Sequence, residues 1–160
     1  MYRYEDDSLM LHNDLYQINM AESYWNDGIH ERNAVFDLYF RNMPFGSGYA
    51  VFNGLKRMIQ FIENFHFSDS DIEYLQSIGY KNDFLKYLKN LKFTGNIRAM
   101  QEGELCFGNE PLLRVEAPLI QAQLIETILL NIVNFHTLIT TKASRIRQVA
   151  PQDTLMEFGT

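Results

Sequence analysis

The stretch that decides the fold is LIQAQLIETILLNIVNFHTLITTKASRIRQV, residues 119–149. Its apolar residues recur at helical spacing and predict one long amphipathic helix from about Leu119 to Val149. At 1.5 Å per residue this helix would span roughly 45 Å, which suits a central or interface helix of a small domain. Polar residues interrupt the apolar run, so we expect a buried helix of a soluble protein and no membrane span. They are Gln121, Gln123, Glu126, Asn131, Asn134 and His136.

The residues at and beyond the end of this helix predict a change of structure. Lys142, Arg145 and Arg147 lie in the last turns, where cations interact favourably with the C-terminal end of a helix. Pro151 ends the helix, and DTLMEFG (153–159) has the pattern of a strand. Because a strand needs neighbours on both edges, we expect this chain to be the N-terminal portion of a longer protein.

Short β-prone runs precede the long helix. NIRAM (96–100), GELCF (103–107) and LLRVEA (112–117) are separated by turn residues and predict a small, mostly antiparallel sheet. Ala34 to Phe40, AVFDLYF, predicts a further strand because β-branched and aromatic residues nearly alternate there. Cys106 lies in one of these runs, and we expect a buried, unreactive thiol.

The first half of the chain carries helical patterns. Asp14 followed by Gln17 is an acidic relative of the capping box and predicts a helix start. A loop follows the strand that ends near Phe40, and the run from Tyr49 to Phe65 then has helical spacing.

Residues 68–91 predict a pair of short antiparallel helices. Ser68 or Ser70 caps the first helix, Gly79 ends it, and KNDFLKYLKNL (81–91) forms the second. The Lys and Asp residues of this pair are expected to form a solvated face. Helices and a segregated antiparallel sheet together predict an α+β fold.

The composition of the chain excludes several classes of function. The 160 residues are 46% hydrophobic, which suits one globular domain with a substantial core. A net charge of -6 argues against general nucleic-acid affinity and against a basic membrane surface. One cysteine excludes an intrachain disulfide, and the N-terminal MYRYEDDSLM lacks the apolar segment of a secretion signal. We therefore expect a cytoplasmic protein.

General catalytic motifs are missing, and only one anion site is a candidate. Arg41 follows a predicted strand and precedes NMPFGSG, where Gly46 and Gly48 shape a loop. The loop either receives a phosphate or simply turns, and Arg41 either binds an anion or makes a surface ion pair. The four histidines, His12, His30, His66 and His136, have no metal-ligand spacing.

Three segments taken together resemble nicotinate phosphoribosyltransferases. They are LHNDLYQINMAESYW (11–25), FDLYFRNMPFGSGYAVFNGL (36–55) and the stretch from GELCF through the long helix to LMEFG. The resemblance implies that residues 1–150 form an N-terminal α+β domain ending in the long helix. Residues 151–160 would then be the first strand of an irregular α/β barrel that is otherwise missing from this chain.

The resemblance also implies a reaction and partners. Nicotinate and phosphoribosyl pyrophosphate would form nicotinate mononucleotide, with coupled ATP hydrolysis and Mg²⁺, in a homodimer whose subunits share active sites. Tyr16 would stack on the pyridine ring across the dimer interface, Asp14 would fix Tyr16 as a helix cap, and Arg41 would contact phosphate. Neither nucleic acid nor membrane is implied as a partner.

No catalytic residue of the family is expected in this chain, because its phosphorylated histidine would lie beyond Thr160. The fragment alone is therefore predicted to be inactive. Two alternatives remain: the related nicotinamide-specific phosphoribosyltransferase, and a non-catalytic dimerisation or assembly module.

Overall fold

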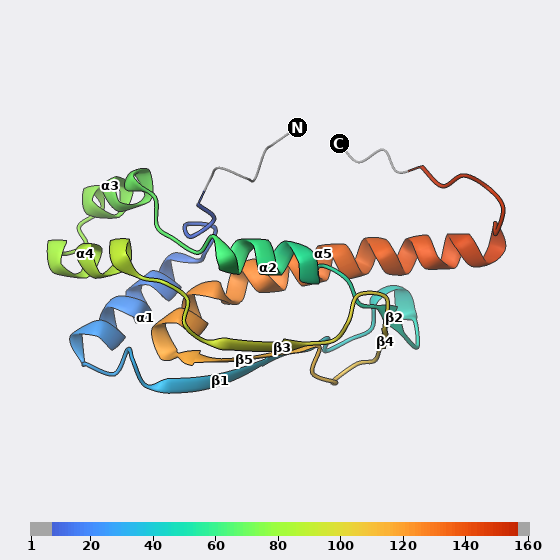
Figure 1. The fold of residues 1–160 in the computed structure, drawn as a ribbon, viewed down its shortest axis with the longest axis horizontal. Coiled ribbons are helices and arrows are strands. Elements are labelled where there is room, and N and C mark those ends of the chain that lie inside the picture. The colour runs from blue at the N-terminus through green and yellow to red at the C-terminus, as the bar shows by residue number, and fades with distance from the viewer. Residues whose placement is uncertain (1–7, 157–160) are drawn as a thin grey trace.

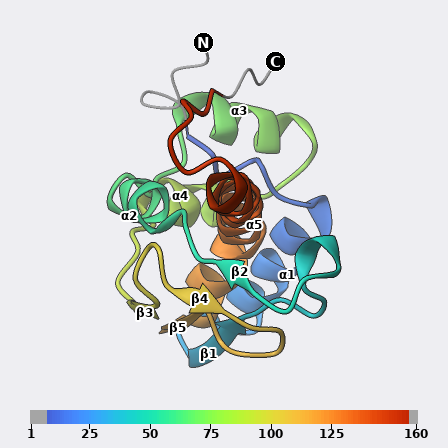
Figure 2. The same cartoon turned by 90° about the vertical axis from the view of Figure 1, so that its right-hand side faces the viewer.

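A single long helix organises the computed structural model, which describes residues 8–156. Helix α5 (Leu119–Val149) has the bounds that the sequence predicts. It lies over a three-stranded sheet, with α1 (Leu15–Asn26) and α2 (Leu55–Glu63) on its two sides (Figure 1, Figure 2). The arrangement confirms the expected mixture of helices and antiparallel sheet.

The main sheet has the order β1-β5-β3 and is antiparallel throughout. Strand β5 (Leu113–Pro118) lies in the centre, between β1 (Asn33–Leu38) and β3 (Asn96–Ala99). Leu113, Val115 and Ala117 are buried because alternate side chains of β5 face the helices. The intervening residues belong to the outer face of the sheet.

The expected strand from Ala34 to Phe40 is two residues too long at its end. The ladder between β1 and β5 stops at the pair of Leu38 and Leu113. Beyond it, the Asn109 N–H donates to the Phe40 carbonyl at 2.8 Å, so the partner is now a loop and no longer a strand. The alternation of the sequence continues past the point where its pairing partner leaves the sheet.

An ion pair crosses the outer face of this sheet and gives a pH-dependent prediction. Arg114 donates two hydrogen bonds to Asp37, from Nε to Oδ1 at 2.7 Å and from Nη2 to Oδ2 at 2.9 Å. These bonds hold the pKa of Asp37 below its usual value. A lowered folded-state pKa contributes stability above the unfolded value of about 4, and this contribution is lost as the pH falls through the folded value.

We therefore expect Asp37→Asn to lower the urea midpoint at about pH 6, where Asp37 is ionised in both states. At about pH 3 the difference between wild type and variant should shrink. Urea unfolding curves at both values measure this, and an equal difference at both would contradict the assignment.

A second small sheet corrects the helix expected from Tyr49 to Phe65. Ala50–Val51 forms strand β2, which pairs antiparallel with β4 (Leu105–Cys106), and α2 begins only at Leu55. Gly54 precedes α2 with a φ of +107°, in a region that favours glycine. A Cβ at this position would lie 3.1 Å from the Ile132 carbonyl oxygen, so the glycine also permits close packing on α5.

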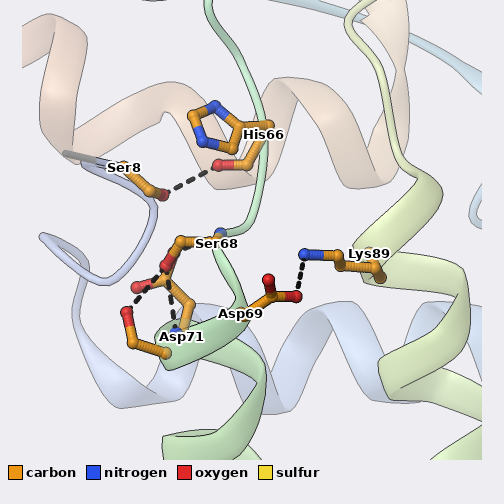
Figure 3. Close-up of polar contacts among 7 residues, drawn as sticks. Ser8, His66, Ser68, Asp69, Asp71 and Lys89 are labelled. Carbon is orange, nitrogen blue, oxygen red and sulfur yellow. Dashed lines mark hydrogen bonds and ion pairs between the residues drawn. The ribbon is translucent and has the colours of Figure 1, made fainter. Parts of the chain in front are cut away.

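The paired short helices are confirmed, with α3 at Asp69–Ser77 and α4 at Asn82–Asn90. Of the two candidate caps, Ser68 forms the capping box: it accepts from the Asp71 N–H, and its own N–H donates to Asp71 (Figure 3). Lys89 pairs with Asp69 between the two helices. The charged face is therefore only partly solvated, because Asp71 is buried in its cap.

Helix α5 supplies much of the core. By length and composition α5 could cross a membrane, a test that the core helix of a soluble protein also passes. Its buried face packs against the sheet, α1 and α2, as the core helix of a globular protein does. Cys106 is buried as expected, and burial raises the pKa of its thiol.

The ends of the chain leave one expectation open. Arg147 donates to the carbonyls of Ala150, Pro151 and Asp153, which confirms its predicted role at the end of α5. The strand expected at 153–159 lies partly outside the described residues, and its described part, through Met156, is neither helix nor strand.

Candidate functional site

The segment that carries Tyr16 is fastened along one side of α5. Asn13 donates from Nδ2 to the Leu124 carbonyl at 2.8 Å, and the side chains of His12 and Asn131 meet at 3.2 Å. These contacts join residues far apart in the sequence. They place the first turn of α1 beside the N-terminal half of α5.

Gln17 makes two further hydrogen bonds to α5. Its side chain is fully buried, its Nε2 donates to Glu126 at 3.1 Å, and Thr127 Oγ1 donates to its Oε1 at 2.8 Å. The sequence predicts that Gln17 closes a capping box with Asp14. This prediction is wrong, because the Gln17 side chain bonds to α5 instead. Asp14 is the N-cap residue, but its side chain makes no capping hydrogen bond.

The Tyr16 side chain is exposed, unlike that of its neighbour Gln17. Tyr16 is 55% exposed although Gln17, the next residue, is fully buried. Partial burial and the neighbouring carboxylates of Asp14 and Glu126 raise the pKa of its hydroxyl. Tyr16 is therefore neutral near pH 7 and presents an exposed aromatic face, which is able to stack on a flat ring.

A shallow trough, apolar in its first part, runs between the sheet and α5. Its first part has a volume of about 100 Å³ and its second about 290 Å³, and the two share Leu38 and Leu130. Phe36 and Tyr39 are 40% and 46% exposed along it. Glu126, whose carboxylate is near Tyr16, lines the first part, and Phe40, the residue before Arg41, lines the second.

Arg41 lies in the loop that follows β1, where its side chain is exposed. Its guanidinium makes no hydrogen bond or ion pair with any other residue between 8 and 156. The alternative of a surface ion pair thus has no partner in the described part of the chain. Neither Tyr16 nor Arg41 lines either part of this trough, so these two hollows do not bring the two side chains together.

No metal-binding group emerges in the part of the chain that the structure describes. Between residues 8 and 156 no three His, Cys, Asp or Glu side chains are close enough to hold an ion. His136 instead bonds through Nδ1 to the Ile132 carbonyl at 2.7 Å, as expected of a partly buried helix residue.

The sequence reasoning missed Glu126 and the true role of Gln17. The polar residues that interrupt the apolar run of α5 were the available signal, because a buried polar side chain requires a partner. Glu126 and Thr127 meet Gln17, and Gln121 accepts from the Thr94 N–H at 2.8 Å. The sequence shows that partners are needed but does not identify them.

A substitution at Gln17 tests whether its hydrogen bonds to Glu126 and Thr127 stabilise the contact between α1 and α5. Gln17→Leu keeps the volume but removes both side-chain hydrogen bonds, leaving Thr127 and Glu126 without this partner. We expect the free energy of unfolding to fall by about 1–3 kcal/mol. Gln60→Leu on the exposed side of α2 is the matched control and should change it by less than about 0.5 kcal/mol. Urea unfolding curves measure both, and equal effects would argue against the fastening.

Comparison with known families agrees with the resemblance. The family model described as nicotinate phosphoribosyltransferase (NAPRTase) N-terminal domain matches residues 11–134. A nicotinate phosphoribosyltransferase of Bacillus subtilis (strain 168) is 61% identical over 160 residues, which cover 99% of this chain and 33% of the relative. A nicotinate phosphoribosyltransferase of Caenorhabditis elegans is 44% identical over 151 residues, which cover 91% of this chain and 27% of the relative.

Solved structures agree in fold. The crystal structure of human nicotinic acid phosphoribosyltransferase superposes with a TM-score of 0.83 at 38% identity, covering 92% of this chain and 30% of that one. A nicotinate-nucleotide pyrophosphorylase from Pyrococcus furiosus has a TM-score of 0.70 at 18% identity, covering 94% of this chain and 31% of that one. At this identity the match shows a shared fold alone. The chain spans about a third or less of the length of these relatives.

Proposed function

The chain belongs to the nicotinate phosphoribosyltransferase family, and from this membership we propose that it is the N-terminal part of an enzyme that makes nicotinate mononucleotide. The pyridine nitrogen of nicotinate would attack C1 of phosphoribosyl pyrophosphate. A C–N bond forms, a C–O bond breaks, and pyrophosphate leaves. The observation that carries the proposal is the match of the family's N-terminal domain to residues 11–134.

In this proposal Tyr16 binds the pyridine ring. The segment that carries it is anchored through the buried neighbour Gln17, and the exposed ring is available to stack on a flat ligand. Asp14 acts through its position as N-cap and through its carboxylate near Tyr16. Arg41 lies on a glycine loop and has no partner among residues 8–156, which supports contact with a phosphate group.

Mg²⁺ and ATP belong to the proposed reaction, but the described residues do not fit a metal site. Residues 8–156 offer no group of three possible ligands, and Mg²⁺ requires several oxygen ligands. We therefore derive no step through the ion. In the proposal, Mg²⁺ and ATP are bound where the rest of the full-length enzyme contributes, and the phosphorylated histidine lies there as well.

The division into residues 1–150 and the first barrel strand, 151–160, is part of the same proposal. The exposed apolar trough and the C-terminal half of α5 support it, since such surfaces are normally covered by further chain or by a second subunit. A cytoplasmic homodimer with shared active sites is proposed accordingly. The fragment alone should be inactive.

Two other functions are separated from this one by assay. If the full-length protein is the nicotinamide-specific enzyme, it uses nicotinamide better than nicotinate when phosphoribosyl pyrophosphate, Mg²⁺ and ATP are supplied. The assembly module, which the exposed trough favours, predicts turnover of neither. Preference for nicotinate, with a rate that falls when ATP is omitted, is the result that we expect.

A further inference from the structure

The loop after Arg41 contains a residue in an unfavourable backbone conformation. Phe45, within the short turn Pro44–Gly46, has φ +60° and ψ +23°. A bulky side chain rarely adopts this left-handed conformation, because its Cβ crowds the following carbonyl oxygen. Such a conformation persists only when surrounding contacts hold it, so the contacts of Phe45 are informative.

Arg145 provides those contacts from α5. The central carbon of its guanidinium lies 5.5 Å from the centre of the Phe45 ring and 5.8 Å from that of Tyr49. Both distances are in the range of cation–π attraction. One turn further along α5, Gln148 Nε2 donates to the Tyr49 hydroxyl at 3.0 Å. The stacking corrects the expectation that Arg145, like Arg147, serves the end of its own helix.

The other end of the loop is fixed by the segment between β4 and β5. The Asn109 N–H donates to the Phe40 carbonyl at 2.8 Å, directly before Arg41. Inside the loop, the Ser47 N–H donates to the Pro44 carbonyl at 3.1 Å. The loop is thus held at both ends, and Arg41 lies on it with no partner between residues 8 and 156.

We propose that Arg145 is a positioning residue, which holds the loop of residues 41–48 so that Arg41 is ready to receive a phosphate group. This rests on the proposed function, in which Arg41 contacts a phosphorylated substrate. Arg145 acts through the two rings and does not itself bind the substrate. A guanidinium suits this task because its planar face stacks on aromatic rings, which an ammonium group does less well.

The test uses the full-length protein with three variants. Arg145→Met removes the charge at similar length, and Arg145→Lys keeps the charge but loses the planar group. Arg147→Met is the matched control, because Arg147 lies on the same helix but, among residues 8–156, donates to carbonyls that follow α5. Hydrogen exchange of peptides covering residues 42–50, without substrate, reports the loop directly.

We expect exchange in Arg145→Met to be about five- to tenfold faster than in wild type, and unchanged in Arg147→Met. The KM for phosphoribosyl pyrophosphate should rise by a similar factor, while the KM for nicotinate changes less than about twofold. Arg145→Lys should recover part of both effects. A purely structural role would move both KM values or neither.

The results against the proposal are distinct from those against the function. Unchanged hydrogen exchange in Arg145→Met would show that Arg145 does not hold the loop of residues 41–48, whatever the activity of the variant. Faster exchange with an unchanged KM for phosphoribosyl pyrophosphate would overturn the positioning role in an active enzyme. A full-length wild type that makes no nicotinate mononucleotide would instead refute the proposed function, and with it the substrate assigned to Arg41.

Discussion

Replacing Tyr16 by alanine in the full-length protein should raise the KM for nicotinate about five- to 140-fold. Stacking of a ring on an aromatic side chain is worth about 1–3 kcal/mol, and each 1.4 kcal/mol corresponds to a factor of ten. The side chain is 55% exposed, so its removal costs the fold little. The loss should therefore fall on binding and leave the unfolding curve nearly unchanged.

Tyr16→Phe is the control, since it keeps the ring and removes only the hydroxyl. It should retain most of the affinity for nicotinate, because stacking depends on the ring. Steady-state kinetics with nicotinate varied at saturating phosphoribosyl pyrophosphate measure both variants. An unchanged KM in Tyr16→Ala would make Tyr16 a surface residue without a role in binding.

Replacing Phe52 by alanine should lower the free energy of unfolding by about 3–5 kcal/mol. Phe52 is fully buried, and its backbone joins β2 to the 101–104 turn through hydrogen bonds with Glu104 and Gly103. Removing the ring leaves a cavity where the second small sheet meets α5, because the backbone bonds prevent the site from collapsing.

The smaller substitution Phe52→Leu fills most of that cavity and should cost markedly less, under about 2 kcal/mol. Urea unfolding curves of the full-length protein compare the two variants. If both variants cost the same, the loss would not come from the cavity, and the packing described for Phe52 would be wrong.

The elements that the sequence predicts well are those whose signal is local. Helix α5 has a continuous apolar period bounded by Pro118 and Pro151, and its ends agree with the prediction. Ser68 and Asp71 form their capping box within a few residues of one another. Neither feature depends on a distant part of the chain.

The features that the sequence does not predict depend on distant partners. Ala50–Val51 is a strand only because Leu105–Cys106 pairs with it, and by itself its pattern continues a helix. Gln17 has the spacing of a capping residue, yet burial against α5 gives it better partners in Glu126 and Thr127.

The candidate site also combines residues with a local sequence signal and residues that depend on distant partners. Tyr16 and Arg41 were selected by their motifs, and the structure places both as exposed side chains on supported segments. The residues that support them were not predicted, since Arg145 reaches Phe45 and Tyr49 only in the folded protein. A motif therefore identifies the residue that faces a ligand more readily than the residue that holds it.

The most direct measurement assays the full-length protein and the 160-residue chain side by side for nicotinate mononucleotide, with nicotinate, phosphoribosyl pyrophosphate, Mg²⁺ and ATP. The account predicts product from the longer protein and none from the shorter, because in the proposal this chain supplies binding residues and the rest of the enzyme supplies the catalytic group. Product from neither would contradict the enzyme assignment and favour an assembly module. Product from the short chain would contradict the claim that catalysis depends on the rest of the enzyme.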